Sequence, residues 1–278
     1  MSLRVAPALD FDADALAACF TAAFDGYLAG SFAMDAVVLP RFLARQGADL
    51  ALSRAVERDG VLAGVAFVGA FADRRRLCAM GVRAQARGTG ASTALLQQVI
   101  AEARAAQVAS LELEVFVQNV PAVRLYRSAG FIDGPALWGF MRAAGGRVEA
   151  VADTPDVVSL DEAAGWLLLS GPDDLPYQVS GYALRHGDVT QQPRRLGEAL
   201  LVFSQAGADA RLVVNVLVDA DPAQADAARL LRWLVARYPG HTIHVPQLMR
   251  DDVAARALRA EGFEVLPLHQ MQMRLPLG

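Results

Sequence analysis

The chain has 278 residues, 54% of them hydrophobic, and a formal net charge of -4. This length exceeds that of one typical domain and allows sizeable hydrophobic cores. The charge balance, without a basic cluster, argues against nucleic acid as the main partner, and no apolar run is long enough to span a membrane. The start, Met1 to Arg4, lacks the basic and apolar regions of a signal peptide, so we expect a cytoplasmic protein.

The two cysteines, Cys19 and Cys78, are too few for a disulfide framework and lack the spacing of metal ligands. We expect both to be small core residues, and we expect no metal site. A nucleophilic Cys78 would need a partner base, and the sequence identifies none. The one basic run, Arg74 to Arg76, is expected at a solvated strand end.

The N-terminal segment combines helices and strands. Asp12 begins a helix with an Asp-rich start and one apolar face. Asp59-Gly60 is the preferred dipeptide of a two-residue hairpin. The expected elements are a strand at Arg4 to Pro7, helices at Asp12 to Phe24 and at Ala36 to Gln46 with an interruption near Pro40, and strands at Leu50 to Glu57 and Val61 to Phe71.

A glycine-rich turn, Arg87 to Ser92, follows an expected strand at Leu77 to Val82. Gly88 and Gly90 can adopt positive φ, which lets main-chain N–H groups approach an anion. Apolar residues at helical spacing follow, so the turn begins a helix whose free N–H groups and dipole favour a diphosphate. The alternative is an ordinary loop before a core helix. The patterns of a nucleotide P-loop and of a dinucleotide site are absent.

A second strand and a short helix come next. Leu111 to Val117 alternates as a half-buried strand does. Asn119 precedes a helix with Pro121 in its first turn, and Gly130 ends that helix before Phe131. A final strand of this half is expected at Trp138 to Arg142.

These motifs resemble the GNAT superfamily of acyl-CoA-dependent acetyltransferases. Val82 to Gly90 resembles its pyrophosphate motif, with Ala84 where proline is frequent and Ser92 where Gly or Ala is usual. The resemblance covers roughly the first half of the chain and is silent about the acyl acceptor. Its second signature is matched by Asn119, Ala122, Leu125, Tyr126, Gly130 and Phe131.

The resemblance implies an α/β (α+β) fold, a mixed and mostly antiparallel twisted sheet flanked by helices. The strands that hold Met80 and Val115 would splay apart and admit the pantetheine arm of acetyl-CoA, the expected cosubstrate. The implied cofactor-binding residues are Met80, Gly81, Val82, Arg83, Arg87, Gly88, Thr89, Gly90, Ala91, Ser92, Asn119 and Ala122.

Acyl transfer to an amine needs a neutral nucleophile, a polarised thioester carbonyl and a proton for the departing thiolate. A backbone N–H within Met80 to Val82 would polarise the carbonyl. The resemblance makes the Tyr126 hydroxyl the acid, and the alternative is a packed helix aromatic.

The resemblance also suggests Glu114 as the base, because its spacing to Asn119 and Tyr126 matches that of ribosomal-protein alanine N-acetyltransferases. The competing interpretation is that Glu112 and Glu114 face solvent or balance nearby arginines. Asp25 and Glu57 are further candidates for the base.

Gly145-Gly146 breaks the pattern and predicts a boundary between domains 1-145 and 146-278. Beyond it the elements repeat, which predicts two similar domains in tandem. A shift of 132 positions superposes Arg124 on Arg256, Arg127 on Arg259, Gly130 on Gly262 and Phe131 on Phe263. The expected elements are strands at Trp166 to Leu169, Tyr177 to Arg185, Arg211 to Asp219 and Thr242 to Val245, and helices at Pro222 to Tyr238 and Asp251 to Glu261.

The second half lacks the residues that would bind a cofactor. Asp219 to Gln224 stands in place of the glycine turn, and its carboxylates would repel a diphosphate. Leu258 replaces Tyr126, and Asp251 replaces Asn119. We therefore expect a degenerate GNAT-like domain that completes a wall of the acceptor site or makes a homodimer contact.

Two functions remain open from the sequence. The first is an acetyltransferase that moves an acetyl group from acetyl-CoA directly to a primary amine of a small molecule or peptide. The second is a non-catalytic acyl-CoA-binding sensor or scaffold protein. The tyrosine at position 126 favours the enzyme.

Overall fold

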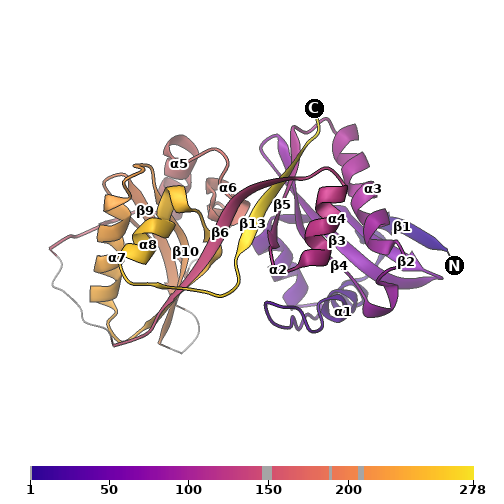
Figure 1. Cartoon of the computed structure of the whole chain (residues 1–278), viewed down its shortest axis with the longest axis horizontal. Coiled ribbons are helices and arrows are strands. Elements are labelled where there is room, and N and C mark those ends of the chain that lie inside the picture. Colours follow the sequence, from indigo (N-terminus) through magenta and orange to yellow (C-terminus); the bar gives the residue numbers. More distant parts are fainter. Residues whose placement is uncertain (1, 146–151, 188–189, 206–209) are drawn as a thin grey trace. The chain divides into compact units, whose positions relative to one another are not determined.

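The computed structural model describes residues 2–145, 152–187, 190–205 and 210–278 (Figure 1). The chain divides into two compact units. Unit 1 comprises Met1–Val115, Asn119–Gly134 and Gln272–Gly278, and unit 2 comprises Phe116–Gln118 and Pro135–Met271. None of the described helices is long and apolar enough to cross a membrane.

Unit 1 is a mixed sheet with helices on it. Its strand order is β1-β2-β3-β4-β5-β13-β6, in which β4 and β5 are parallel, whereas the pairs β1–β2, β2–β3 and β3–β4 are antiparallel. The strands are β1 (Leu3–Pro7), β2 (Ala48–Arg58), β3 (Val61–Phe71), β4 (Arg74–Val82), β5 (Ser110–Phe116), β6 (Ile132–Arg142) and β13 (Gln270–Pro276). The helices are α1 (Ala13–Ala23), α2 (Val38–Gln46), α3 (Ala91–Ala105) and α4 (Val120–Ser128).

The helices α1 and α2 of unit 1 pack on one face of this sheet, around aromatic rings. Phe20 of α1 lies 5.7 Å from Phe67 of β3 and 5.3 Å from Phe42 of α2, between ring centroids. Asp12 caps α1 by accepting a hydrogen bond from the Ala15 N–H at 2.7 Å. The Asp59-Gly60 turn joins β2 to β3 with φ of 52° and 80°, as a hairpin of this kind requires.

The position of Pro40 explains why α2 differs from the interrupted helix that the sequence predicted. The helix α2 is not interrupted at Pro40, because it starts at Val38 and Pro40 lies in its first turn. A proline there removes an N–H that has no partner within the helix in any case.

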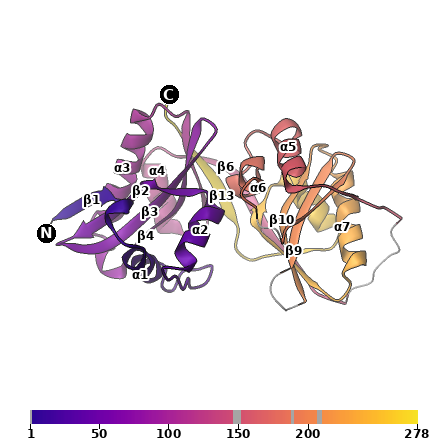
Figure 2. The same cartoon turned by 180° about the vertical axis from the view of Figure 1, so that it is seen from behind.

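Unit 2 repeats this plan with the strand order β6-β11-β10-β9-β8-β7, and β12 also pairs with β6. Figure 2 shows its strands β9 and β10 with the helices α5, α6 and α7. In the part of unit 2 that the structure describes, β10 and β11 are parallel, and the pairs β9–β10, β6–β11, β6–β12, β7–β8 and β8–β9 are antiparallel. The strands are β7 (Asp156–Val157), β8 (Gln192–Leu196), β9 (Ala199–Gln205), β10 (Arg211–Asp219), β11 (Thr242–Met249) and β12 (Glu264–Val265). The helices are α5 (Leu160–Ser170), α6 (Gly181–Leu184), α7 (Ala225–Arg237) and α8 (Arg256–Ala260), the last preceded by a π-helical turn at Asp251–Ala255.

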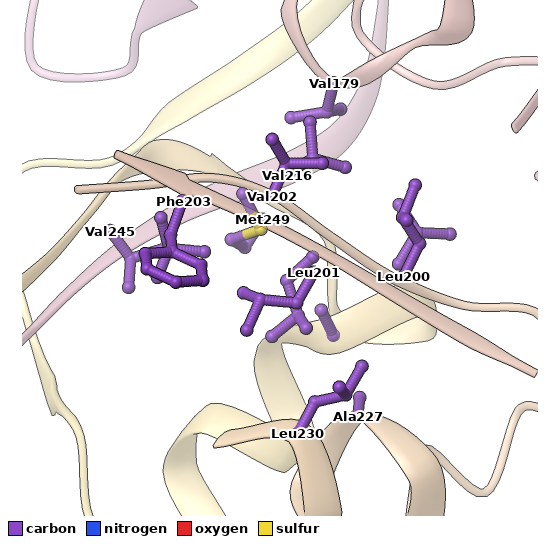
Figure 3. Close-up of a cluster of buried hydrophobic side chains, with 14 of the residues drawn as sticks. Val179, Leu200, Leu201, Val202, Phe203, Val216, Ala227, Leu230, Val245 and Met249 are labelled. Carbon is purple, nitrogen blue, oxygen red and sulfur yellow. The ribbon is translucent and has the colours of Figure 1, made fainter. Parts of the chain in front are cut away.

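The core of unit 2 is mostly aliphatic and includes the buried rings of Phe140, Phe203 and Phe263, of which Figure 3 shows Phe203. Phe203 and Leu201 of β9 are fully buried, together with Val245 and Met249 of β11 and Leu230 of α7. Side chains from β9, β11 and α7 therefore meet in one core, as the close-up shows.

Two strands expected in unit 2 are wrong. Trp166 to Leu169 lies inside α5, and Tyr177 to Arg185 contains a short 3-10 helix and α6. The helix α5 begins with a capping box, in which the Ser159 side chain and Glu162 satisfy each other's backbone N–H groups. Such a cap stabilises a helix start that the leucine run alone does not reveal.

The internal repeat is confirmed at the level of single hydrogen bonds. The Phe131 N–H donates to Tyr126 O at 3.1 Å, and the Phe263 N–H donates to Leu258 O at 3.0 Å. Gly130 and Gly262 precede these phenylalanines with φ of 95° and 76°. Both short helices therefore end in the same left-handed glycine turn, which only glycine adopts without strain.

The division of the chain differs from a single boundary at Gly145-Gly146. The strand β6 continues from unit 1 into unit 2, where Trp138 to Arg142 pair with β11. Residues 272–278 return to unit 1 as part of β13. Gly146 lies outside the described residues, and Gly145 belongs to unit 2.

Candidate functional site

The strands β4 and β5 of unit 1 pair only at their beginnings. Their parallel register joins Arg74 to Ser110 and ends at the pair of Arg76 and Glu112. A bulge at Cys78 then shifts the register of β4 against β3. Because a bulge bends a strand away from regular pairing, β4 is free to diverge from β5 beyond this point.

The glycine turn adopts the conformation expected from its residues. Gly88 and Gly90 have φ of 75° and 89°, and Gly90 is the N-cap of α3. A Cβ at Gly88 would meet no atom within 4 Å, so backbone conformation, and not space, requires glycine there. The Arg87 guanidinium donates to Ala23 O at 3.2 Å, which holds this side chain against the end of α1.

A pocket of about 500 Å³ lies between β4, the turn, α4 and the segment that follows α1. Eight residues predicted from the sequence line it. They are Met80, Gly81, Val82, Arg87, Ser92, Asn119, Ala122 and Tyr126. These residues come from separate segments of unit 1, and folding brings them to one cavity.

The other predicted residues do not line this pocket. Gly88, Thr89, Gly90 and Ala91 shape the turn beside it, and the Thr89 hydroxyl donates to Ala86 O at 2.8 Å. Arg83 lines a second hollow, of about 330 Å³, together with Arg58 and Gln85. The Nε atom of Arg83 is buried there without a hydrogen-bond partner among the described residues.

The segment after α1 contributes pocket residues that the sequence analysis missed. Phe24, Gly26, Tyr27 and Leu28 line the pocket with Asp25, which was considered only as a base. The sequence signal that could have located this segment is the pair of aromatic residues Phe24 and Tyr27. They flank a turn at Gly26, whose φ is 66°. Gly81 lets this segment approach β4, because a Cβ there would come within 2.8 Å of the Phe24 ring.

Tyr126 is buried at the wall of the pocket. Its side chain is 7% exposed and its ring lies 5.7 Å from that of Phe131. Burial raises the pKa of the Tyr126 phenol well above its ordinary value, and the nearby Tyr27 raises it further. The phenol is therefore neutral at neutral pH and can donate a proton.

Asn119 lies at the start of α4 and lines the pocket. Its Oδ1 accepts a hydrogen bond of 3.4 Å from the Ala122 N–H and so caps α4. Burial raises the pKa of the Tyr27 phenol, and the Asn119 side chain lowers it by a smaller amount.

Glu114 lies outside the pocket lining and forms a buried ion pair with Arg76. Its Oε2 lies 2.6 Å from Arg76 Nη2, and the two side chains are 4% and 3% exposed. Gln46 completes the arrangement, because its backbone oxygen accepts a hydrogen bond from Arg76 at 2.9 Å. This geometry fits the competing interpretation, in which Glu114 balances an arginine.

The expectation of a solvated basic strand end is wrong for Arg76 and Arg74. Arg76 is buried, and the Arg74 side chain is 15% exposed and pairs with Glu112 at 3.3 Å. The carboxylates of β5 face the arginines of the neighbouring strand, since the two strands are in parallel register here.

The cysteines behave as core residues. Cys19 is fully buried and Cys78 is partly buried, and burial raises the pKa of both thiols. A raised pKa keeps a thiol protonated and unreactive. Among the described residues, no group of three His, Cys, Asp or Glu side chains could hold a metal ion.

The start of α7 in unit 2, which corresponds to the start of α3, is occupied by the chain itself. Asp219 is 1% exposed, and its Oδ2 accepts a hydrogen bond of 2.9 Å from the Ala227 N–H in the first turn of α7. Gln224 is 2% exposed and bridges Asp251 O and the Ala257 N–H, at 2.7 and 3.0 Å.

The comparisons with known proteins agree with this architecture. The model of the Acetyltransferase (GNAT) family matches residues 11–131. The tandem GNAT protein from the clavulanic acid biosynthesis pathway has a TM-score of 0.64 at 15% identity, over 100% of this chain and 99% of that one. No curated protein matches the sequence.

Two further solved structures share the whole fold. The GCN5-related N-acetyltransferase from Sphaerobacter thermophilus has a TM-score of 0.63 at 15% identity, over 99% of this chain and 95% of that one. The corresponding protein from Anabaena variabilis has a TM-score of 0.65 at 14% identity, over 100% and 73%. Identities this low show the fold alone. Residues 11–131 thus match the model of the acetyltransferase (GNAT) family, and the chain as a whole shares the fold of the tandem GNAT protein.

Proposed function

We propose that the protein transfers an acetyl group from acetyl-CoA directly to a primary amine of a small molecule or peptide, and that unit 1 carries the reaction. The observation that carries this proposal is the pocket, which is lined by Met80 to Val82, by Ser92 at the start of α3 and by Tyr126. A thioester, its diphosphate and a proton donor can be accommodated by these groups together.

Each part of the cosubstrate has a proposed partner. The main-chain N–H groups of Arg87 to Ser92 bind the diphosphate at the positive end of α3, with the Arg87 charge beside them. The pantetheine arm lies along Met80 to Val82, and a backbone N–H of this segment polarises the thioester carbonyl. Asn119 and Ala122 at the start of α4 complete the cofactor site.

The proton for the departing thiolate comes from Tyr126 in this proposal. The amine nitrogen attacks the thioester carbon, the C–S bond breaks, and the Tyr126 O–H proton moves to the sulfur. The amine nitrogen has one proton in excess after attack, and that proton returns to the phenolate. The balance closes without Glu114, whose carboxylate binds Arg76.

Amine-dependent release of free CoA is the decisive measurement. We expect release from acetyl-CoA with at least one member of an amine panel, together with the acetylated amine in the mass spectrum. The matched control is Tyr126→Phe, which keeps the ring and removes the proton donor. Calorimetric binding of acetyl-CoA without any amine-dependent release would contradict the proposal and leave an acyl-CoA-binding sensor.

A further inference from the structure

We propose that Asp25 determines which amine the protein accepts, and that its carboxylate binds the second cationic group of a small amine that carries two positive charges. The proposal deepens the acetyltransferase function proposed above and rests on it. Asp25 follows the C-cap of α1 and lines the same pocket of unit 1 as Tyr126, the proposed proton donor.

The charged residues of this pocket are one arginine and one aspartate. Among the lining residues that the structure describes, only Arg87 and Asp25 carry formal charges. The Arg87 guanidinium donates to Ala23 O at 3.2 Å. In the described part of the chain, no hydrogen bond or ion pair engages the exposed Asp25 carboxylate. A carboxylate without a partner in a pocket attracts a cation.

The stability of α1 does not account for a carboxylate at this position. The helix ends at Ala23 with Phe24 as its C-cap, so Asp25 is the first residue beyond it. The negative end of the helix dipole lies there and favours cations over anions. At the other end of α1, by contrast, Asp12 caps the helix by accepting from the Ala15 N–H. Asp25 therefore adds to a negative potential that a cationic ligand would neutralise.

Helix ends of opposite sign meet at the pocket. Ser92 lies in the first turn of α3 and Ala122 in the first turn of α4, where the helix dipoles are positive, whereas Ala23 is the last residue of α1. The diphosphate is proposed to bind at the start of α3, so the end of α1 is left for the acceptor. A cationic group is favoured there, and a carboxylate is disfavoured.

The residues on either side of the Asp25-Gly26 turn are held by contacts within unit 1. Phe24 stacks on Phe20 with 4.4 Å between ring centroids, and it meets the Tyr27 ring edge-on at 5.1 Å. The Tyr27 N–H donates to Phe24 O at 3.1 Å and closes the turn. The backbone of Asp25 is therefore ordered before a ligand binds, which lowers the entropic cost of binding. The rings of Phe24 and Tyr27 also line the pocket, and aromatic faces attract cations.

This role differs from that of a general base. A base takes a proton from every acceptor amine, so its loss lowers kcat for all of them. A carboxylate that binds a second ammonium group acts only on amines that have one, and its loss raises their KM. In the proton balance proposed above, the excess proton returns to Tyr126, so Asp25 keeps its charge throughout.

The test compares putrescine, butylamine and γ-aminobutyrate, which share a four-carbon chain and differ in the charge at its far end. In the assay of CoA release, the wild type should use putrescine with a kcat/KM about tenfold above that of butylamine, and γ-aminobutyrate least well. Asp25→Asn should raise the KM for putrescine by about five- to tenfold, and leave the kinetics with butylamine and the Kd for acetyl-CoA within about twofold. Asp25→Lys should reverse the order of putrescine and γ-aminobutyrate. The matched control is Asp14→Asn, which removes the same charge from an exposed position at the start of α1.

A binding measurement separates this proposal from the function on which it rests. Calorimetry with putrescine, in the presence of free CoA, should give a Kd about five- to tenfold weaker for Asp25→Asn than for the wild type. That result without any CoA release would support the cation site and refute the acetyltransferase function. Equal kcat/KM for putrescine and butylamine in an active wild type would overturn the role of Asp25. A loss of kcat with all amines in Asp25→Asn would instead identify Asp25 as the base.

Discussion

The two units carry the same strand, turn and helix, but the start of the helix is filled in different ways. In unit 1 the turn contains Gly88 and Gly90, and no described side chain caps α3. In unit 2 the Asp219 carboxylate occupies the first turn of α7 through the Ala227 N–H. The position that unit 1 is proposed to offer to a diphosphate therefore holds an anion of the chain itself in unit 2.

The parallel strands β4 and β5 of unit 1 also differ in charge from the parallel strands β10 and β11 of unit 2. Arg76 pairs with Glu112 in the register of β4 and β5, and Val213 takes the corresponding place opposite His244 in β10 and β11. Val213 carries no charge, so the buried ion pair of Arg76 with Glu114 has no equivalent at this position of β10. The repeat preserves the backbone geometry, whereas the charges on corresponding strands differ.

The largest expected effect comes from placing a carboxylate in unit 1 where unit 2 has one. Gly90→Glu should abolish acetyl-CoA binding, because its φ of 89° is strained for any side chain and the new charge repels the diphosphate. Calorimetry measures the loss. Gly240→Glu, at a site where a Cβ meets nothing within 4 Å, is the control for an added charge. Unchanged affinity in folded Gly90→Glu would place the diphosphate elsewhere.

Removing the ion pair of unit 1 should cost stability. Arg76→Met leaves the 4% exposed Glu114 carboxylate without its partner, and this should lower the free energy of unfolding by about 3–5 kcal/mol. Chemical denaturation measures it, and the exposed Arg45→Met is the control. Glu114→Gln should also be destabilised and yet keep kcat within about tenfold. A much larger loss of kcat in folded Glu114→Gln would restore Glu114 as the base.

Tyr126 marks a chemical difference between the two units, because the corresponding residue of unit 2 is Leu258. Tyr126→Phe should lower kcat by about 10²-fold, or about 2.7 kcal/mol, with little change in acetyl-CoA affinity. Steady-state kinetics and calorimetry check the two quantities. Values within a few fold of the wild type would show that the ring only packs.

The pH dependence follows from the same residue. An acid whose pKa is raised keeps its proton to higher pH, so Tyr126 should stay protonated beyond the ordinary phenol value of 10.0. We expect no decline of kcat from loss of this proton up to about pH 9. A falling limb near neutral pH that vanishes in Tyr126→Phe would contradict the raised pKa.

The smallest expected effect lies in unit 2. Asp219→Ala leaves the buried Ala227 N–H without its acceptor and should lower the free energy of unfolding by about 1–3 kcal/mol. It should not create a second cofactor site, because Gln224 still fills the turn. Calorimetry should return one acetyl-CoA per chain for both proteins. Two equivalent sites in the wild type would overturn the contrast between the units.

Local sequence signals predicted most of the fold. Periodicity located α3 and α7, and Asp59-Gly60 located the hairpin, because these elements depend on neighbouring residues. The errors arose in elements whose structure depends on helix caps or on contacts between residues far apart in the chain. Trp166 to Leu169 is helical through the capping box at Ser159, and the partners of β6 and β13 depend on residues far away in the chain.

The residues of the candidate site also divide into those that a continuous motif locates and those that only the fold brings together. The glycine turn and the start of α4 could be located because each is a continuous motif. The pairing of Arg76 with Glu114 depends on strand register, and the place of Tyr27 depends on the fold of the segment after α1. Neither leaves a periodic or spaced pattern in the sequence.

The return of β13 to unit 1 has a consequence for synthesis on the ribosome. Leu277 donates its N–H to Ala109 O at 3.0 Å, and Arg274 pairs with Glu112 at 2.7 Å, so this strand is bound to the edge of β5. It is translated only after all of unit 2. The N-terminal half must therefore emerge with an open sheet edge, exposed to aggregation or chaperones, until the later part of the chain has been made.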